Sequence, residues 1–362
     1  MSAVVTGSGS AFPADVTQDA LWDGFFARHF AGVRVAGRIF RAAGVRRRHT
    51  VADPRDEDLS GWSTGPRMER YVTEALPLGK SAVAAALDDA RLAPDDVGLF
   101  TVVSCTGYTT PGIDIRLARD LGMADTVQRL LVGHMGCYAA LPALGTAADF
   151  VVARQRPAVV LCLELTSLHI QPPTDDLEQV VAHALFSDAA AAVVLEPGGV
   201  GPAVVDVAAR TDVATAGYMT WDVTDLGFRM GLSPRVPDVL AVHVGPMVDD
   251  LLARNGVRRD EVDGWAVHPG GPRILDVVAD RLGLGDTDLD ASRAVLAEHG
   301  NCSSATVLLV LARMAPPAPG RYTVALAFGP GLTLYAVLLR GQDSAASSER
   351  SGTTSRASGL IR

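Results

Sequence analysis

Three residues of this chain have side chains that suit acyl transfer, and each stands at a sharp turn in the sequence. They are Cys137, His268 and Asn301. A cysteine thiolate attacks a thioester readily and is also a good leaving group. An imidazole or an amide can donate hydrogen bonds to the oxygen that becomes negative when a carboxyl group is lost. Together they suit acyl exchange followed by decarboxylation, provided that the fold brings them together.

Cys137 follows a short apolar segment and precedes a run of small helix-forming residues. Pro142 lacks an N–H donor and is tolerated only in the first turn of a helix, so we expect a helix over 138–154 that begins just after the cysteine. The positive end of that helix lowers a thiol pKa and favours a reactive thiolate. The alternative is a buried structural cysteine, which is common in protein cores.

His268 ends the apolar run Gly264–Val267, which has the length of a buried strand. Gly270 and Gly271 permit a tight turn, and Pro272 opens a predicted helix over 272–282. Enzymes with α/β layers place their chemistry at this edge of the sheet. A lone histidine is more often structural, so the position alone does not decide between the two roles.

Asn301 lies in the turn Glu298–Ala305, which leads into a predicted helix over 303–314. Asparagine and serine at such a place can simply cap the helix. One chain nevertheless contains three turns that each carry a side chain suited to acyl transfer, which favours a shared site.

The segments between and around these turns are predicted to form alternating strands and helices. This alternation predicts an α/β layered fold. A composition change near Pro197 divides the chain into 1–196 and 197–341, and the Ser- and Gly-rich tail 342–362 is predicted to be disordered. The apolar strand-length runs are Leu99–Val103, Val159–Leu165, Ala190–Leu195, Gly264–Val267, Thr323–Phe328 and Leu332–Leu339, and the further helices are 67–92 and 239–255.

The net charge, the cysteine spacing and the lengths of the apolar runs argue against several classes of function. The net charge is −9, which opposes binding to nucleic acid. The four cysteines form no CxxC pair, so we expect no metal site, and the chemistry needs no cofactor. Neither a signal peptide nor a run of 18 apolar residues is apparent, so we expect a cytoplasmic protein without a membrane span.

Several short blocks, taken together, resemble type III polyketide synthases, the chalcone-synthase-like family, and its bacterial branch in particular. They occur in the family's order over roughly residues 35–340. The blocks are Val103–Gly112, Gly136-Cys137, Ala184–Val193, His268–Pro272, Gly300–Ser304 and Phe328–Thr333.

The resemblance implies a thiolase-like fold with a five-layer αβαβα core of two pseudo-duplicated halves, acting as a homodimeric acyltransferase. The resemblance implies that Cys137 accepts a starter from acyl-CoA and carries the growing chain. His268 would hold Cys137 as a thiolate. His268 and Asn301 would then bind the malonyl-CoA thioester during decarboxylation.

The resemblance also implies substrate-binding positions. Phe186 and Met230 match the two gatekeeper positions, and the flexible Met230 favours a fatty or branched acyl starter that is extended to a pyrone or resorcinol. The predicted cavity wall comprises Cys105, Thr166, His169 and Ser303. The cluster Arg46, Arg47 and Arg48 matches the basic rim that grips CoA phosphates, although such a run can also be a solvated turn.

Other interpretations remain open from the sequence. A route from malonyl-CoA alone to a tetrahydroxynaphthalene is slightly favoured by Cys105. A ketoacyl-ACP synthase III uses the same three residue types for one condensation. Papain-like proteases also carry Cys, His and Asn in this order along the chain, but their cysteine lies near the mature N-terminus. A non-catalytic scaffold would not need all three.

Overall fold

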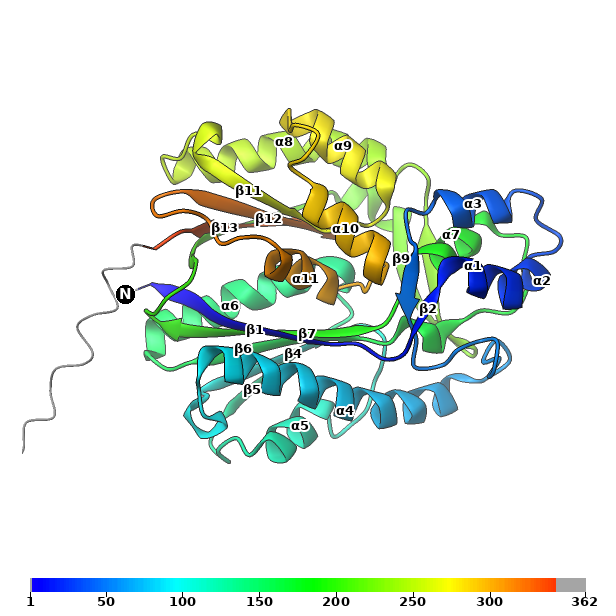
Figure 1. Cartoon of the computed structure of the whole chain (residues 1–362), viewed down its shortest axis with the longest axis horizontal. Helices are drawn as coiled ribbons and strands as arrows, with labels where there is room; N and C mark the ends of the chain where they lie inside the picture. Colours follow the sequence, from blue (N-terminus) through cyan, green and yellow to red (C-terminus); the bar gives the residue numbers. More distant parts are fainter. Residues whose placement is uncertain (1, 343–362) are drawn as a thin grey trace, which may run out of the picture.

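The computed structural model describes residues 2–342, so the tail predicted to be disordered lies almost wholly outside the described residues. Strands and helices alternate as the sequence predicts (Figure 1). The strands are β1 (Ala3–Ala11), β2 (Asp15–Thr17), β3 (Arg47–His49), β4 (Leu99–Ser104), β5 (Gln128–Gly133), β6 (Ala158–Glu164), β7 (Ala189–Pro197), β8 (Ala203–Thr211), β9 (Met219–Thr224), β10 (Gly227–Leu232), β11 (Val262–Val267), β12 (Tyr322–Gly329) and β13 (Thr333–Arg340). The α-helices are α1 (Gln18–Leu21), α2 (Ala27–His29), α3 (Ala36–Ala42), α4 (Thr64–Ala90), α5 (Ile113–Leu121), α6 (Ala140–Arg154), α7 (Leu177–Leu185), α8 (Val236–Arg254), α9 (Pro272–Leu282), α10 (Asp290–His299) and α11 (Ala305–Arg313).

The main sheet runs in the order β11-β12-β13-β8-β1-β7-β6-β4-β5. Strands β1 and β8 pair only at Val4 and Ala203, so the sheet separates there into two halves that face each other. Figure 1 shows α6 and α11 between these halves, with α4 and α5 outside one and α8 and α9 outside the other. The five-layer α/β core expected from the sequence is therefore confirmed.

The two halves repeat one topology although the sequence shows no visible repeat. Strands β4-β6-β7-β1 have the same neighbours and directions as β11-β12-β13-β8: one parallel pair followed by two antiparallel pairs. Helix α6 leads into β6, and α11 leads into β12. Cys137 and Asn301 thus precede equivalent central helices.

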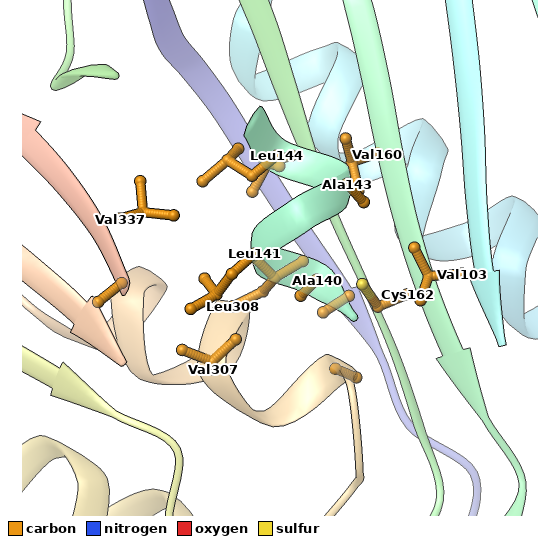
Figure 2. Packing of buried hydrophobic residues seen from close by; sticks show 14 of the residues in the cluster. Val103, Ala140, Leu141, Ala143, Leu144, Val160, Cys162, Val307, Leu308 and Val337 are labelled. Atoms are coloured by element: carbon orange, nitrogen blue, oxygen red, sulfur yellow. The ribbon is translucent and has the colours of Figure 1, made fainter. Parts of the chain in front are cut away.

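Helix α6 lies between the two halves of the sheet, and small and aliphatic residues cover the faces that it buries there. Leu141 and Leu144 lie among side chains from both halves, including Leu308 and Val337 (Figure 2). A Cβ on Gly145 would come within 2.9 Å of Val207 Cγ2, so the helix needs glycine to approach β8. The stretch Gly136–Arg154 is also long and apolar enough to cross a membrane, but its burial in the core explains its composition.

Leu141→Ala should lower the free energy of unfolding by about 2–5 kcal/mol, because it leaves a cavity where both halves meet. Leu141 is fully buried. Val152→Ala on the exposed side of the same helix is the matched control, and it should change stability by less than about 0.5 kcal/mol. Urea unfolding of both variants measures the difference, and equal effects would contradict this account of the core.

Candidate active site

The three candidate catalytic residues line one cavity of ≈ 460 Å³. Cys137 lies in the 3₁₀ turn Gly136–Tyr138, just before α6. His268 follows the last residue of β11, and Asn301 lies in the turn between α10 and α11. Residues that are far apart in sequence therefore meet because two central helices begin, and one buried strand ends, at the same place.

The turn that contains Cys137 packs against the segment Gly329-Pro330, and this close contact requires a glycine in each of the two segments. Gly136 has φ +77°, and a Cβ there would lie 2.6 Å from Pro330 Cδ. A Cβ on Gly329 would lie 2.7 Å from Tyr138 Cδ1 and 3.3 Å from the backbone nitrogen of Cys137. The block Phe328–Thr333 thus packs directly against the turn of the cysteine.

Burial controls the charge of the Cys137 and His268 side chains, which are 6% and 1% exposed. It raises the pKa of the Cys137 thiol to about 12, although a hydrogen bond with Ser303 opposes the shift. It lowers the pKa of His268 to about 3. Burial alone thus disfavours the charged forms of both side chains, and the ion pair that the family resemblance implies stays a prediction.

The imidazole of His268 is available to a ligand. Neither ring nitrogen has a hydrogen-bond partner among the described residues, although both atoms are buried. A buried polar group without a partner is costly, so such a group in a cavity indicates a site that a bound molecule completes.

Asn301 is held so that its amide nitrogen remains to donate. Its Oδ1 accepts a hydrogen bond of 2.9 Å from the backbone N–H of Ser303, which leaves Nδ2 as the free polar end. Its backbone N–H donates to Leu185 O at 2.9 Å, and its backbone oxygen accepts from Ser187 N at 3.0 Å. These bonds place Asn301 beside Phe186, with which it forms a β-bridge.

A smaller chamber of ≈ 20 Å³ adjoins the cysteine. The predicted gate residues Phe186 and Met230 line both this chamber and the large cavity, as residues between two compartments must. The other predicted residues on its wall are Cys105, Thr166 and Ser303.

Trp221 on β9 also lines the small chamber and was not anticipated. Its Nε1 donates to Cys105 O at 2.6 Å, which fixes the indole in the chamber. The residue stands in the polar segment Met219–Thr224, where no motif marks it. Its role depends on the pairing of β9 with β10, which the sequence does not show.

His169 lines a cavity of ≈ 60 Å³ that adjoins the small chamber and shares Thr166, Phe186, Trp221 and Met230 with it. Its Nδ1 accepts from Phe228 N at 3.0 Å and its Nε2 lies 2.7 Å from Thr106 O, so both ring nitrogens are occupied. The ring also stacks on Phe228, with centroids 4.5 Å apart. These contacts fix the ring in place, and its part in the substrate wall stays a prediction.

The three arginines do not form one basic rim. Arg46 and Arg47 are exposed, and Arg47 pairs with Asp15 at 2.5 Å. Arg48 points the other way from β3 and is only 5% exposed. Its Nη1 donates to the carbonyl oxygens of His183 and Phe186, at the end of α7. Arg48 therefore stabilises the backbone that carries the gate residue Phe186 from the interior of the protein. The prediction that Arg48 belongs to the CoA rim is wrong.

Glu164, at the end of β6, is a second residue that sequence reasoning missed. It is fully buried and accepts hydrogen bonds from Thr106 Oγ1 at 2.8 Å, Ser304 Oγ at 2.5 Å and Cys105 N at 3.0 Å. Burial raises its pKa despite these donors. A lone carboxylate in the apolar run Val159–Leu165 was the signal that could have identified it.

Comparisons with known proteins point to one family. The model of the N-terminal domain of chalcone and stilbene synthases matches residues 2–199, and the model of their C-terminal domain matches residues 204–343. A 1,3,6,8-tetrahydroxynaphthalene synthase of Streptomyces peucetius subsp. caesius is 37% identical over 84% of this chain and 82% of its own length. The α-pyrone synthesis polyketide synthase-like Pks18 of Mycobacterium tuberculosis is 32% identical over 83% and 81%.

Solved structures agree as well. The 1,3,6,8-tetrahydroxynaphthalene synthase of Streptomyces coelicolor A3(2), described as a bacterial type III polyketide synthase, superimposes with a TM-score of 0.89 at 28% identity, over 94% of this chain and 100% of that one. The family models together span nearly all of the described residues. The chain therefore belongs to the chalcone and stilbene synthase family, as a type III polyketide synthase.

Proposed function

We propose that Cys137, His268 and Asn301 carry out repeated decarboxylative condensation of malonyl-CoA onto an acyl-CoA starter. The observation that carries this assignment is the buried imidazole of His268, whose two unpartnered nitrogens share a cavity with the thiol and with the amide of Asn301. No group of three or more metal-ligating side chains is found in the part of the chain that the structure describes.

Loading begins when the sulfur of Cys137 attacks the carbonyl carbon of the starter thioester. The thiol proton passes to His268, whose ring nitrogens have no other partner among the described residues and share the cavity with the thiol. The carbon–sulfur bond to CoA breaks, and the departing CoA thiolate takes up the proton. The acyl group is then held on Cys137 as a new thioester.

Extension begins when malonyl-CoA loses carbon dioxide and its electron pair moves onto the thioester oxygen. A nitrogen of His268 and Nδ2 of Asn301 donate hydrogen bonds to this enolate oxygen. The enolate carbon then attacks the acyl carbon on Cys137 and displaces the sulfur as a thiolate, which takes up a proton from water to regenerate the thiol. The longer product remains attached to CoA and can reload the thiol.

The large cavity favours a fatty or branched acyl starter because its wall is mostly aliphatic. The apolar wall includes Ile39, Val181, Met219, Met230, Leu232 and Leu240. A malonyl-only route to a tetrahydroxynaphthalene is the second candidate. It is supported by the relative of that activity at 37% identity and by Cys105 beside Ser303, with the two side-chain atoms 3.4 Å apart.

We propose that exposed arginines guide the CoA phosphates to the cavity. Arg46 and Arg47 follow α3, whose end lines the large cavity at Ala42. Arg273, on the first turn of α9, lines the same cavity. Guanidinium groups bind phosphate well, so Arg273 joins the first two in the proposed CoA site.

We further propose that the chain acts in the cytoplasm as a homodimer through β5. This strand lies at the end of the main sheet, and Leu131 on it is 48% exposed. Exposed apolar residues on an unpaired edge invite pairing with another strand, and a second copy of the same edge would satisfy it.

Cys137→Ala should abolish condensation, because no acyl-enzyme can form. Asn301→Ala should slow malonyl-CoA decarboxylation about 10²–10³-fold, because one donor to the enolate oxygen is lost. Mass spectrometry of the enzyme and of products from a panel of acyl-CoA starters measures both effects. Unchanged condensation by Cys137→Ala would refute the mechanism, and activity with malonyl-ACP alone would favour a single-condensation synthase.

Trp221→Ala should lengthen the main product by at least one malonyl unit, because it removes the largest side chain in the small chamber. Val223→Ala on the same strand is the control, since Val223 is 65% exposed and lines neither cavity. Product masses from the two variants and the parent enzyme decide the matter. An identical product distribution in all three would show that Trp221 does not limit chain length.

Leu131→Arg should convert the proposed dimer to monomer, because it places a charge on the apolar edge of β5. Val200→Arg, at an exposed position 71% accessible and away from that strand, should leave the dimer intact. Light scattering on a sizing column gives the mass of each. A monomeric parent enzyme, or a dimer that survives Leu131→Arg, would exclude this interface.

A further inference from the structure

Strand β3 lies behind the site and contacts the segment that carries the gate. The backbone N–H of His49 donates to Ser187 Oγ at 2.8 Å, and the same hydroxyl donates to His49 O at 3.2 Å. Asp188 N also donates to His49 O at 3.1 Å. The residues that follow Phe186 are thus fixed to β3.

The ring of His49 reaches the other segment of the site. Its Nε2 lies 2.9 Å from Nδ1 of His299, and its own Nδ1 lies 3.2 Å from Pro13 O. A carbonyl oxygen only accepts, so Nδ1 of His49 carries the proton and Nε2 is the acceptor. His299 must therefore donate from its Nδ1. Phe12 packs against both rings, at centroid distances of 4.6 and 4.4 Å.

These contacts close a ring of hydrogen bonds around the site. His299 is the last residue of α10 and stands two positions before Asn301. Asn301 O accepts from Ser187 N, and the hydroxyl of Ser187 is bonded to His49. The ring therefore runs from His49 to His299, along the chain to Asn301, across to Ser187 and back. Movement at the histidine pair would displace the amide of Asn301.

We propose that His49 and His299 are positioning residues that hold Asn301 where its amide meets the enolate oxygen. The proposal rests on the decarboxylation function proposed above. Neither histidine lines the large cavity that contains Cys137, so neither touches the reacting atoms there. Their hydrogen bond acts through the turn at residues 299–301 and through Ser187.

The pair keeps its hydrogen bond across the neutral pH range. Burial lowers the pKa of His49, and burial followed by the charge of His49 lowers the pKa of His299 to about 4. A first proton would enter the free Nε2 of His299 and leave the bond intact, whereas a second would set N–H against N–H. The charged groups that face the pair are Asp15, Arg47, Glu298 and Arg313.

The test compares two substitutions of one residue. His299→Leu removes the donor, whereas His299→Asn keeps an amide N–H at nearly the position of Nδ1. His299→Leu should lower kcat for malonyl-CoA decarboxylation about tenfold, which corresponds to the loss of one well-placed hydrogen bond. The rate of Cys137 acylation and the KM for malonyl-CoA should stay near those of the parent. His299→Asn should restore kcat to within about twofold.

His243 supplies the matched control, because it also forms a hydrogen bond, to Asp212 Oδ2 at 3.0 Å, but lies on α8 outside both chambers. His243→Leu and His243→Asn should leave decarboxylation unchanged. If His299→Leu is insoluble, His49→Leu and His49→Gln carry the same expectations, since the glutamine amide oxygen can replace Nε2 as acceptor.

Two outcomes would overturn the positioning role. One is parental decarboxylation in His299→Leu, and the other is an equal fall in acylation and decarboxylation that His299→Asn does not restore. Failure of the underlying function would differ, because the parent enzyme itself would then show no malonyl-CoA decarboxylation, or Asn301→Ala would leave it unchanged.

Discussion

The site depends on one constraint, which is that two helices must begin inside the protein. Helices α6 and α11 lie between the two halves of the sheet, and their first turns point toward the same cavity. The first N–H groups of a helix lack partners within the helix, so the turns before them must supply or receive hydrogen bonds. In this chain those turns carry Cys137 and Asn301. The pseudo-duplicated topology thus places two reactive groups together without any long loop.

Desolvation follows from this placement and determines how the residues can act. A charged thiolate or imidazolium is costly where water is excluded, so burial raises the pKa of Cys137, lowers the pKa of His268 and favours the neutral form of each. Charge then appears only as the reaction proceeds, where hydrogen-bond donors in a dry cavity are most effective. The buried Glu164 fits the same rule, because donors from Cys105, Thr106 and Ser304 surround its oxygens and burial still raises its pKa.

The sequence predicted the features that are encoded locally. Cys137, His268 and Asn301 were recognisable because glycine, proline and apolar runs mark the turns in which they stand. The errors concern partners that are remote in sequence. Arg48 looked like part of a basic run, but strand alternation turns it inward to the carbonyl oxygens of α7. For His169, which was assigned to the cavity wall, the sequence did not show that β10 supplies the Phe228 N–H that occupies its ring. No local pattern contains either contact.

The sizes of the two chambers constrain where a polyketide chain can grow. The small chamber of ≈ 20 Å³ has room for about one water molecule, whereas the large cavity of ≈ 460 Å³ can hold an acyl chain. A growing chain on Cys137 must therefore extend into the large cavity or displace side chains between the two. Trp221 is fixed by its hydrogen bond to Cys105 O, but Met230 has a flexible apolar side chain and lines both spaces. Movement of Met230 would cost less free energy than movement of Trp221. The growing polyketide can therefore displace Met230 at the gate more easily than Trp221 on the wall of the small chamber.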